Sequence, residues 1–171
     1  MRQIRTRTTG FTALELALSI ALIGIFSAVL LDRLLYYEEA AEKANMEYWV
    51  NELKVGLQLR VGHLMAQSKV VDYLAVSREN PMSWLETPAP GYRGEVVATA
   101  NPQMPPASWY YDRTQRELVY VSGLNRYLQR DAQARPRVHF RVKIVRPEDS
   151  TAQDSTVLGL QLVPAEPYRW F

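Results

Sequence analysis

The sequence predicts an α+β fold, in which one long N-terminal helix packs on a small antiparallel β-sheet. Three observations predict this fold. An apolar run extends from Phe11 to Leu31, a helical pattern without proline continues to about Gln67, and short runs rich in β-branched and aromatic residues follow. With 47% hydrophobic residues among 171, the chain can bury a core. It has no cysteine, which excludes disulfides, thiolate metal sites and cysteine nucleophiles.

Residues 1–10 form a basic leader, because Arg2, Arg5 and Arg7 occur there without an acidic residue. Removing the leader takes three of the 20 basic residues and leaves 17 against 18 acidic ones. The remaining chain is close to neutral, so bulk attraction to nucleic acid is not implied and nucleic acid is not expected as a partner.

The segment 11–31 is predicted to be a transmembrane helix. As a helix it would be about 31 Å long, which matches a hydrocarbon core of about 30 Å. The arginines on its N-terminal side place the N-terminus in the cytoplasm and the rest of the chain outside. Glu15 is unexpected, since an acid in mid-membrane costs about 2.5–3.5 kcal/mol on insertion scales. No Lys, Arg or His lies between Phe11 and Leu31, so its partner must come from a backbone terminus, another subunit or another protein.

Two ordinary interpretations compete for this segment. A cleaved secretory signal peptide fits poorly, because the apolar run is too long and no small-x-small cleavage site follows before Asp32. A plain signal anchor that holds a soluble domain fits everything except Glu15.

The residues G-F-T-A-L-E at 10–15, followed by an apolar helix, resemble the class III signal of type IV pilins and type II secretion pseudopilins. The resemblance implies that a prepilin peptidase cuts between Gly10 and Phe11 and N-methylates Phe11. It also implies that Glu15, as the fifth residue of the mature chain, acts in assembly together with Thr12. Major pilins usually carry a proline kink in this helix and a cysteine pair. Here no proline precedes Pro81 and cysteine is absent, which favours a pseudopilin or a minor pilin.

Cleavage after Gly10 would create an α-amine on Phe11, with a reference pKa near 7.7–8.0. In a helical stack of subunits this amine and the Glu15 carboxylate of a neighbour can pair in a low-dielectric setting. A misplaced subunit would leave both charges unpaired. Glu15 is therefore predicted to fix the register of polymerisation.

The segment 32–67 is predicted to be the periplasmic half of the helix. One apolar stripe at helical spacing should pack on the sheet; it comprises Met46, Trp49, Val50, Leu53, Leu57, Val61 and Leu64. The charges between Asp32 and Lys54 make another face mildly acidic, and this face is predicted to be solvated.

Residues 68–171 are predicted to form the globular α+β head. Turn signals dominate 78–108, with a short strand at 94–100. Further strands are predicted at 108–112, 117–123, 137–146 and 156–163. The polar segment 124–136 is predicted to be a helical turn or an excursion from the sheet. The aromatic C-terminus EPYRWF is predicted to dock on the head or to contact a partner.

In the strand at 137–144, cationic and apolar residues alternate, so Arg137, His139, Arg141 and Lys143 share one face. One interpretation is an anion-binding face for DNA or for acidic helices of neighbouring subunits. The alternative, which is the favoured interpretation, is a soluble outer face or protection of a sheet edge by charge.

Catalytic motifs are missing from the sequence. His63 and His139 lie far apart, and no nucleophile elbow, phosphate loop or convincing acid pair is present. The acids between Glu148 and Asp154 form an oxygen-rich loop, but their spacing fits no calcium motif and a solvated loop is the favoured interpretation. No enzyme activity, metal or cofactor is expected.

Together with the resemblance, these residues predict a structural subunit of a type II secretion pseudopilus. The implied partners are the prepilin peptidase, other pilin or pseudopilin subunits, the lipid bilayer and, indirectly, an inner-membrane platform protein and an assembly ATPase. The implied location is the bacterial inner membrane in a single pass, with a periplasmic head, and then a filament. Two alternatives stay open: a minor type IV pilin for adhesion, motility or DNA uptake, and a signal-anchored periplasmic binding module that does not polymerise.

Overall fold

The structure is a computed structural model that describes residues 12–67, 70–97, 103–129, 136–146 and 158–171. The chain divides into two compact units, Met1–Glu38 and Glu39–Phe171. One α-helix, α1 (Ala13–Ala66), contributes to both units. Its extent agrees with the predicted helix, because no proline interrupts it. The predicted cleavage site Gly10–Phe11 and the loop from Glu148 to Asp154 lie outside the described residues.

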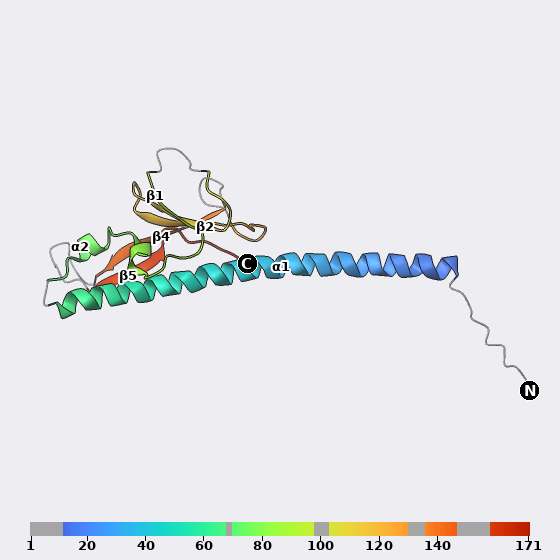
Figure 1. Ribbon diagram of the computed structural model, residues 1–171, viewed down its shortest axis with the longest axis horizontal. Helices are drawn as coiled ribbons and strands as arrows, with labels where there is room; N and C mark the ends of the chain where they lie inside the picture. Colours follow the sequence, from blue (N-terminus) through green and yellow to red (C-terminus); the bar gives the residue numbers. More distant parts are fainter. Residues whose placement is uncertain (1–11, 68–69, 98–102, 130–135, 147–157) are drawn as a thin grey trace, which may run out of the picture. The chain divides into compact units, whose positions relative to one another are not determined.

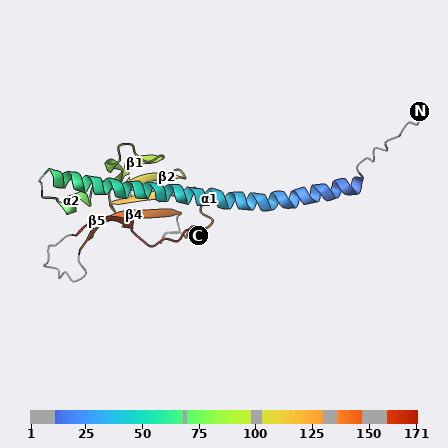
Figure 2. The ribbon, with the colours of Figure 1, turned by 90° about the horizontal axis from the view of Figure 1, so that it is seen from below.

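In the second unit, the C-terminal half of α1 lies across one face of the sheet (Figures 1 and 2). The residues of α1 that are buried there include Met46, Val50, Leu53 and Leu57. They belong to the predicted stripe, and their spacing of three and four residues places them on one side of the helix. The late members Val61 and Leu64 are only partly buried.

Two short helical segments follow α1. The helix α2 (Tyr73–Val76) begins after Asp72, whose side chain accepts a hydrogen bond of 2.9 Å from the amide of Ala75. The 3₁₀ helix η1 (Pro81–Trp84) begins after Asn80, whose side chain accepts from the amide of Met82. Each cap satisfies an amide that the first helical turn leaves unpaired.

The sheet has five strands in the order in which they occur along the chain. They are β1 (Tyr92–Val96), β2 (Ser108–Asp112), β3 (Glu117–Val121), β4 (Arg137–Val145) and β5 (Gly159–Pro164). The pairs β2–β3, β3–β4 and β4–β5 are antiparallel. An α+β arrangement of helix and sheet is therefore confirmed.

The prediction of a purely antiparallel sheet is wrong, because β1 pairs with β2 in parallel. Parallel neighbours cannot be joined by a tight hairpin turn, and residues 97–107 separate these two strands in the sequence. The register of the pair shifts between Tyr92 and Glu95, where Gly94 has a positive φ of 87°. Glycine adopts this conformation without the steric cost that a side chain would carry.

The hydrophobic core lies between α1 and the sheet. It contains Met46, Val50 and Leu53 of the helix, together with Trp109, Leu118 and Phe140 of the sheet and Trp170 near the C-terminus. Trp109 and Tyr120 are direct neighbours across β2 and β3, with ring centroids 4.6 Å apart. These aromatic side chains are buried core residues.

Candidate functional site

The N-terminal end of α1 contains a reciprocal capping arrangement between Thr12 and Glu15. The amide and the hydroxyl of Thr12 each donate a hydrogen bond of 2.9 Å to Oε2 of Glu15. The amide of Glu15 in turn donates to the Thr12 hydroxyl at 3.3 Å. This is a capping box, which the T-x-x-E spacing makes possible. The two predicted assembly residues are thereby held together, and the carboxylate keeps Oε1 without a hydrogen bond among the described residues.

The part of α1 in the first unit presents apolar side chains to its surroundings. None of the most apolar stretch of this helix is buried. Exposed large side chains include Leu14, Leu18, Ile23, Phe26 and Leu30. Length and composition make this helix long and apolar enough to cross a membrane.

The four cationic or titratable residues predicted to share a face of β4 alternate with apolar residues that are buried or partly buried. Val138 and Phe140 are buried in the core, whereas Arg141 and Lys143 are exposed. Neither Arg141 nor Lys143 has an ionic or hydrogen-bond partner among the described residues.

Arg137 and His139 are less available than the other two because each contacts a side chain of another strand, β2 for Arg137 and β3 for His139. Nη1 of Arg137 donates a hydrogen bond of 3.1 Å to the Tyr110 hydroxyl, and the guanidinium lies 5.7 Å from the centre of that ring. Nδ1 of His139 lies 3.0 Å from Oε2 of Glu117. The face therefore contains two exposed cations and two side chains that are tied to the sheet.

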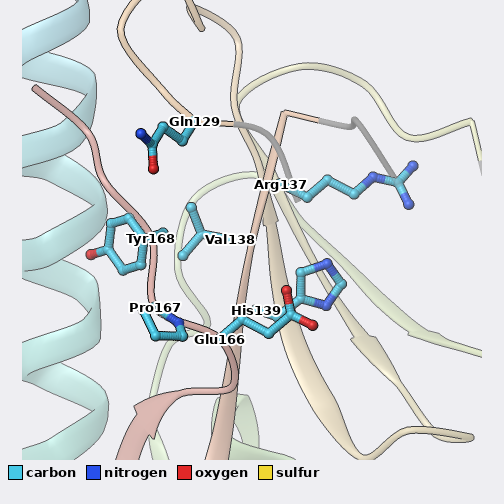
Figure 3. Close-up of a pocket in the computed structure, with 7 residues that line it drawn as sticks. All are labelled: Gln129, Arg137, Val138, His139, Glu166, Pro167 and Tyr168. Carbon is cyan, nitrogen blue, oxygen red and sulfur yellow. The ribbon is translucent and has the colours of Figure 1, made fainter. Parts of the chain in front are cut away.

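A small cavity opens beside Arg137 and His139 (Figure 3). Its lining comprises Gln129, Arg137, Val138, His139, Glu166, Pro167 and Tyr168, and its volume is about 60 Å³. Ligand pockets usually measure about 300–1,000 Å³, so this cavity has room for water molecules but not for an organic ligand.

A larger depression of about 360 Å³ lies between α1 and η1. Its charged groups neutralise each other, because Nε and Nη2 of Arg60 donate to Oε2 and Oε1 of Glu79 at 3.1 and 2.8 Å. The indole of Trp84 also donates to Oε2 of Glu79, at 2.8 Å. His63 also lines this depression and is hydrogen-bonded to Gln67. These contacts hold η1 on the helix.

Two further carboxylates of the second unit belong to Glu39 and Glu42, here called the carboxylate pair, and each accepts three hydrogen bonds from distant parts of the chain. Oε1 of Glu42 accepts hydrogen bonds from the Tyr120 hydroxyl (2.8 Å) and the amide of Gly123 (2.7 Å). Its Oε2 accepts from the amide of Leu124 at 2.8 Å. The carboxylate thus fastens the chain that follows β3 to α1.

Glu39 is 2% exposed and binds the next residues of the same loop. Its Oε1 accepts hydrogen bonds of 2.9 Å from the amide of Tyr127 and from the indole of Trp170. Its Oε2 accepts from the amide of Arg126 at 3.2 Å. A buried carboxylate requires such donors, because burial without them is costly.

The prediction that the acidic face of α1 is solvated is therefore wrong for Glu39 and Glu42, although Glu38 and Glu47 are exposed. A signal was present in the sequence, since Glu39 lies seven residues before Met46 and so on the same helical stripe. The donors could not be identified, because they lie 78 to 131 positions away along the chain.

The C-terminal residues dock on the head, as one of the two predictions for EPYRWF had it. Trp170 is 2% exposed and forms a bridge with Leu128. The ring of Phe171 stacks on Tyr127, with centroids 5.0 Å apart. The end of the chain is thereby part of the same cluster as the carboxylate pair.

Within the described part of the chain, no group of three or more His, Asp or Glu side chains is placed to hold a metal ion. Comparison of the chain with models of known protein families, with curated proteins and with solved structures finds no match.

Proposed function

We propose that the chain is a structural subunit of a type II secretion pseudopilus, processed by a prepilin peptidase and polymerised through its N-terminal helix. The observation that carries this proposal is the first part of α1, where one acid, Glu15, precedes a long segment of exposed apolar side chains. The sequence G-F-T-A-L-E at 10–15 supplies the second argument.

The apolar surface needs a cover, because contiguous exposed apolar surface of this extent is not stable in water. A bilayer covers it before assembly, and the corresponding helices of neighbouring subunits cover it afterwards. Helix packing then provides the favourable free energy of assembly, and no chemistry in the head is needed.

Glu15 supplies the register in this proposal. Thr12 holds one carboxylate oxygen, Oε2, at the helix end, which leaves Oε1 to accept from a second partner. The α-amine created at Phe11 of an adjacent subunit is the cation we assign to it. The pair forms only in the correct stagger, since a misplaced subunit leaves a charge unpaired in a low-dielectric setting.

The first test is the intact mass and the N-terminal peptide of the protein from its native membrane. A chain that begins at N-methylated Phe11 supports processing. A chain that still begins at Met1, in cells with an active prepilin peptidase, contradicts it.

The second test compares assembly of Glu15→Ala with that of Glu38→Ala. Glu38 is an exposed acid of the same helix, so its replacement controls for the loss of one charge. We expect Glu15→Ala to remain in the membrane fraction without forming filaments, while Glu38→Ala assembles. Equal assembly of both variants would remove Glu15 from the mechanism.

The runner-up of the same class is a minor type IV pilin for adhesion, motility or DNA uptake. Both kinds of subunit share the N-terminal segment, so the two proposals differ only in the machine that assembles the chain. Deletion of the gene separates them: loss of protein secretion favours the pseudopilus, and loss of surface pili or of motility favours the pilin.

A different class of function is favoured by one observation. Arg141 and Lys143 are exposed cations on β4 without a partner among the described residues, which suits a signal-anchored module that binds an anionic ligand and does not polymerise. The N-terminal mass distinguishes this alternative, because a signal-anchored module retains Met1.

A further inference from the structure

The apolar surface of α1 does not end with the predicted span. Asp32 and Arg33 follow Leu31, and then four apolar or aromatic residues occur in a row. All four are exposed, at 51% for Leu34, 43% for Leu35, 36% for Tyr36 and 64% for Tyr37. A run of this kind on a protein surface needs a functional reason.

We propose that the segment 32–37 lies in the phospholipid headgroup layer, with Tyr36 and Tyr37 as an aromatic anchor and Arg33 as a ligand of lipid phosphate. This inference rests on the proposed function in one respect, namely that the preceding part of α1 spans a bilayer. It adds the position of the helix in that bilayer and the chemistry that fixes it.

Helix geometry supports this placement. If the acyl region ends near Leu31, Tyr37 lies about 9 Å further along the helix axis. The headgroup layer adds about 5–7 Å on each side of the hydrocarbon core. The segment 32–37 therefore begins where the acyl chains end and finishes near the outer boundary of the headgroups.

The side chains suit this layer. The rings of Tyr36 and Tyr37 meet edge to face, with centroids 5.6 Å apart. Tyrosine combines an apolar ring with a polar hydroxyl, and it is enriched at membrane–water interfaces, where its ring lies at the level of the headgroups. Leu34 and Leu35 add apolar surface on the same turn of the helix.

Arg33 provides the charged contact. It is exposed and has no ionic or hydrogen-bond partner among the described residues. A long arginine side chain can keep its stem along apolar surface while the guanidinium reaches the headgroups. The planar guanidinium donates two parallel hydrogen bonds to a phosphate, which makes a phospholipid phosphate the matching acceptor.

The test uses the absence of cysteine from the chain. Single cysteines are introduced into the full chain at Phe26, Leu34, Tyr37 and the exposed Asn45, and each is given a nitroxide label. The labelled proteins are reconstituted in vesicles of phosphatidylcholine and phosphatidylglycerol. Collisions of each label with oxygen, which concentrates in lipid, and with a water-soluble nickel chelate then report its depth.

We expect a lipid-like ratio of oxygen to nickel collisions at 26, a water-like ratio at 45, and intermediate ratios that fall from 34 to 37. Water-like ratios at 34 and 37 with a lipid-like ratio at 26 would overturn this inference and leave the proposed function intact. A water-like ratio at 26 would contradict both. If the labels at 34 and 37 are protected from the nickel chelate only in assembled filaments, the inference is overturned, and a second copy of the chain covers this segment instead of lipid.

A matched pair of variants tests the anchor itself, with the label kept at Leu34. We expect the double replacement Tyr36→Ser and Tyr37→Ser to shift the collision ratio at 34 toward the value at 45. Tyr48→Ser should not shift it, because Tyr48 is an exposed tyrosine of the same helix beyond the proposed layer. The collision ratio at 34 should differ between vesicles with and without phosphatidylglycerol, and Arg33→Gln should reduce this difference. Equal ratios for all variants would show that these side chains do not set the depth.

Discussion

The indole nitrogen of Trp170 donates a hydrogen bond of 2.9 Å to Oε1 of Glu39, across 131 positions of the sequence. The same carboxylate accepts hydrogen bonds from the amides of Arg126 and Tyr127. A single acid of α1 therefore fixes both a loop of the head and the C-terminus. The stability of the second unit should depend strongly on this one side chain.

Glu39→Ala is predicted to destabilise the head by about 3 kcal/mol. The replacement leaves buried donors without an acceptor, and each unsatisfied group costs about 1–3 kcal/mol. The measurement is thermal unfolding of the full chain in detergent micelles, followed by near-ultraviolet circular dichroism of the buried aromatic residues. Glu38→Ala is the control, and we expect a change of less than about 0.5 kcal/mol for this exposed residue. Equal loss in the two variants would contradict the role of the hydrogen bonds.

Tyr120→Phe is predicted to cost about 1 kcal/mol near neutral pH, since it removes one hydrogen bond to Glu42 and leaves two others in place. Tyr48→Phe, on the exposed face of α1, should have no effect.

The ionisation of Tyr120 should also reduce the stability of the head at alkaline pH. Burial raises the pKa of Tyr120, and the hydrogen bond to Glu42 and the charge of that carboxylate raise it further. A group whose pKa is raised by folding contributes stability that is fully present below its pKa in the unfolded chain, which is near 10 for tyrosine. This contribution is lost as the pH rises above that unfolded-state pKa. Unfolding of the wild-type chain measured between neutral and strongly alkaline pH should therefore show a steeper loss of stability than that of Tyr120→Phe. Parallel curves would contradict this prediction.

Protonation of Glu79 should make the head less stable at acid pH, whereas ionisation of Tyr120 makes it less stable at alkaline pH. Partial burial by itself raises its pKa, but hydrogen bonds from Arg60 and Trp84 and the charge of Arg60 outweigh burial and hold the pKa below the ordinary value. A lowered pKa contributes stability that is present above the unfolded value and is lost as the pH falls through the folded value. The ion pair between Arg60 and Glu79 should contribute about 1 kcal/mol or less to stability, because both side chains are partly exposed.

The measurement for Glu79 is unfolding of Glu79→Gln and of the wild-type chain as the pH is lowered from neutral through 4. We expect the two stabilities to converge in acid, since protonation removes the charge that the variant lacks. Glu86→Gln serves as the control at an exposed acid. A constant difference at every pH would show that packing, and not ionisation, is responsible.

The sequence predicts elements well where the pattern is local. The strand at 108–112 has the predicted bounds, and the helix ends within one residue of the prediction. The capping box of Thr12 and Glu15 could also have been predicted, because its spacing is local.

Elements that depend on distant partners could not be predicted. The parallel pairing of β1 with β2 depends on the path of the connection, and the two strands carry no local signal for it. Glu39 and Glu42 are acids on a helix, for which solvent exposure is the usual expectation. Only the fold brings the amides of 123–127 and the indole of Trp170 to them.

The two late glycines of α1 give a final prediction, because their surroundings differ. A Cβ atom at Gly62 would meet nothing within 4 Å. Replacing a helical glycine with alanine reduces the entropy of the unfolded chain, so Gly62→Ala should stabilise by about 0.5–1 kcal/mol. A Cβ atom at Gly56 would lie 3.2 Å from Cβ of Trp84, which requires η1 to move away from the helix. Gly56→Ala should therefore show no gain or a loss in the same thermal unfolding measurement. An equal gain at both positions would mean that Trp84 yields freely, and the contact between α1 and η1 would then contribute little to the stability of the head.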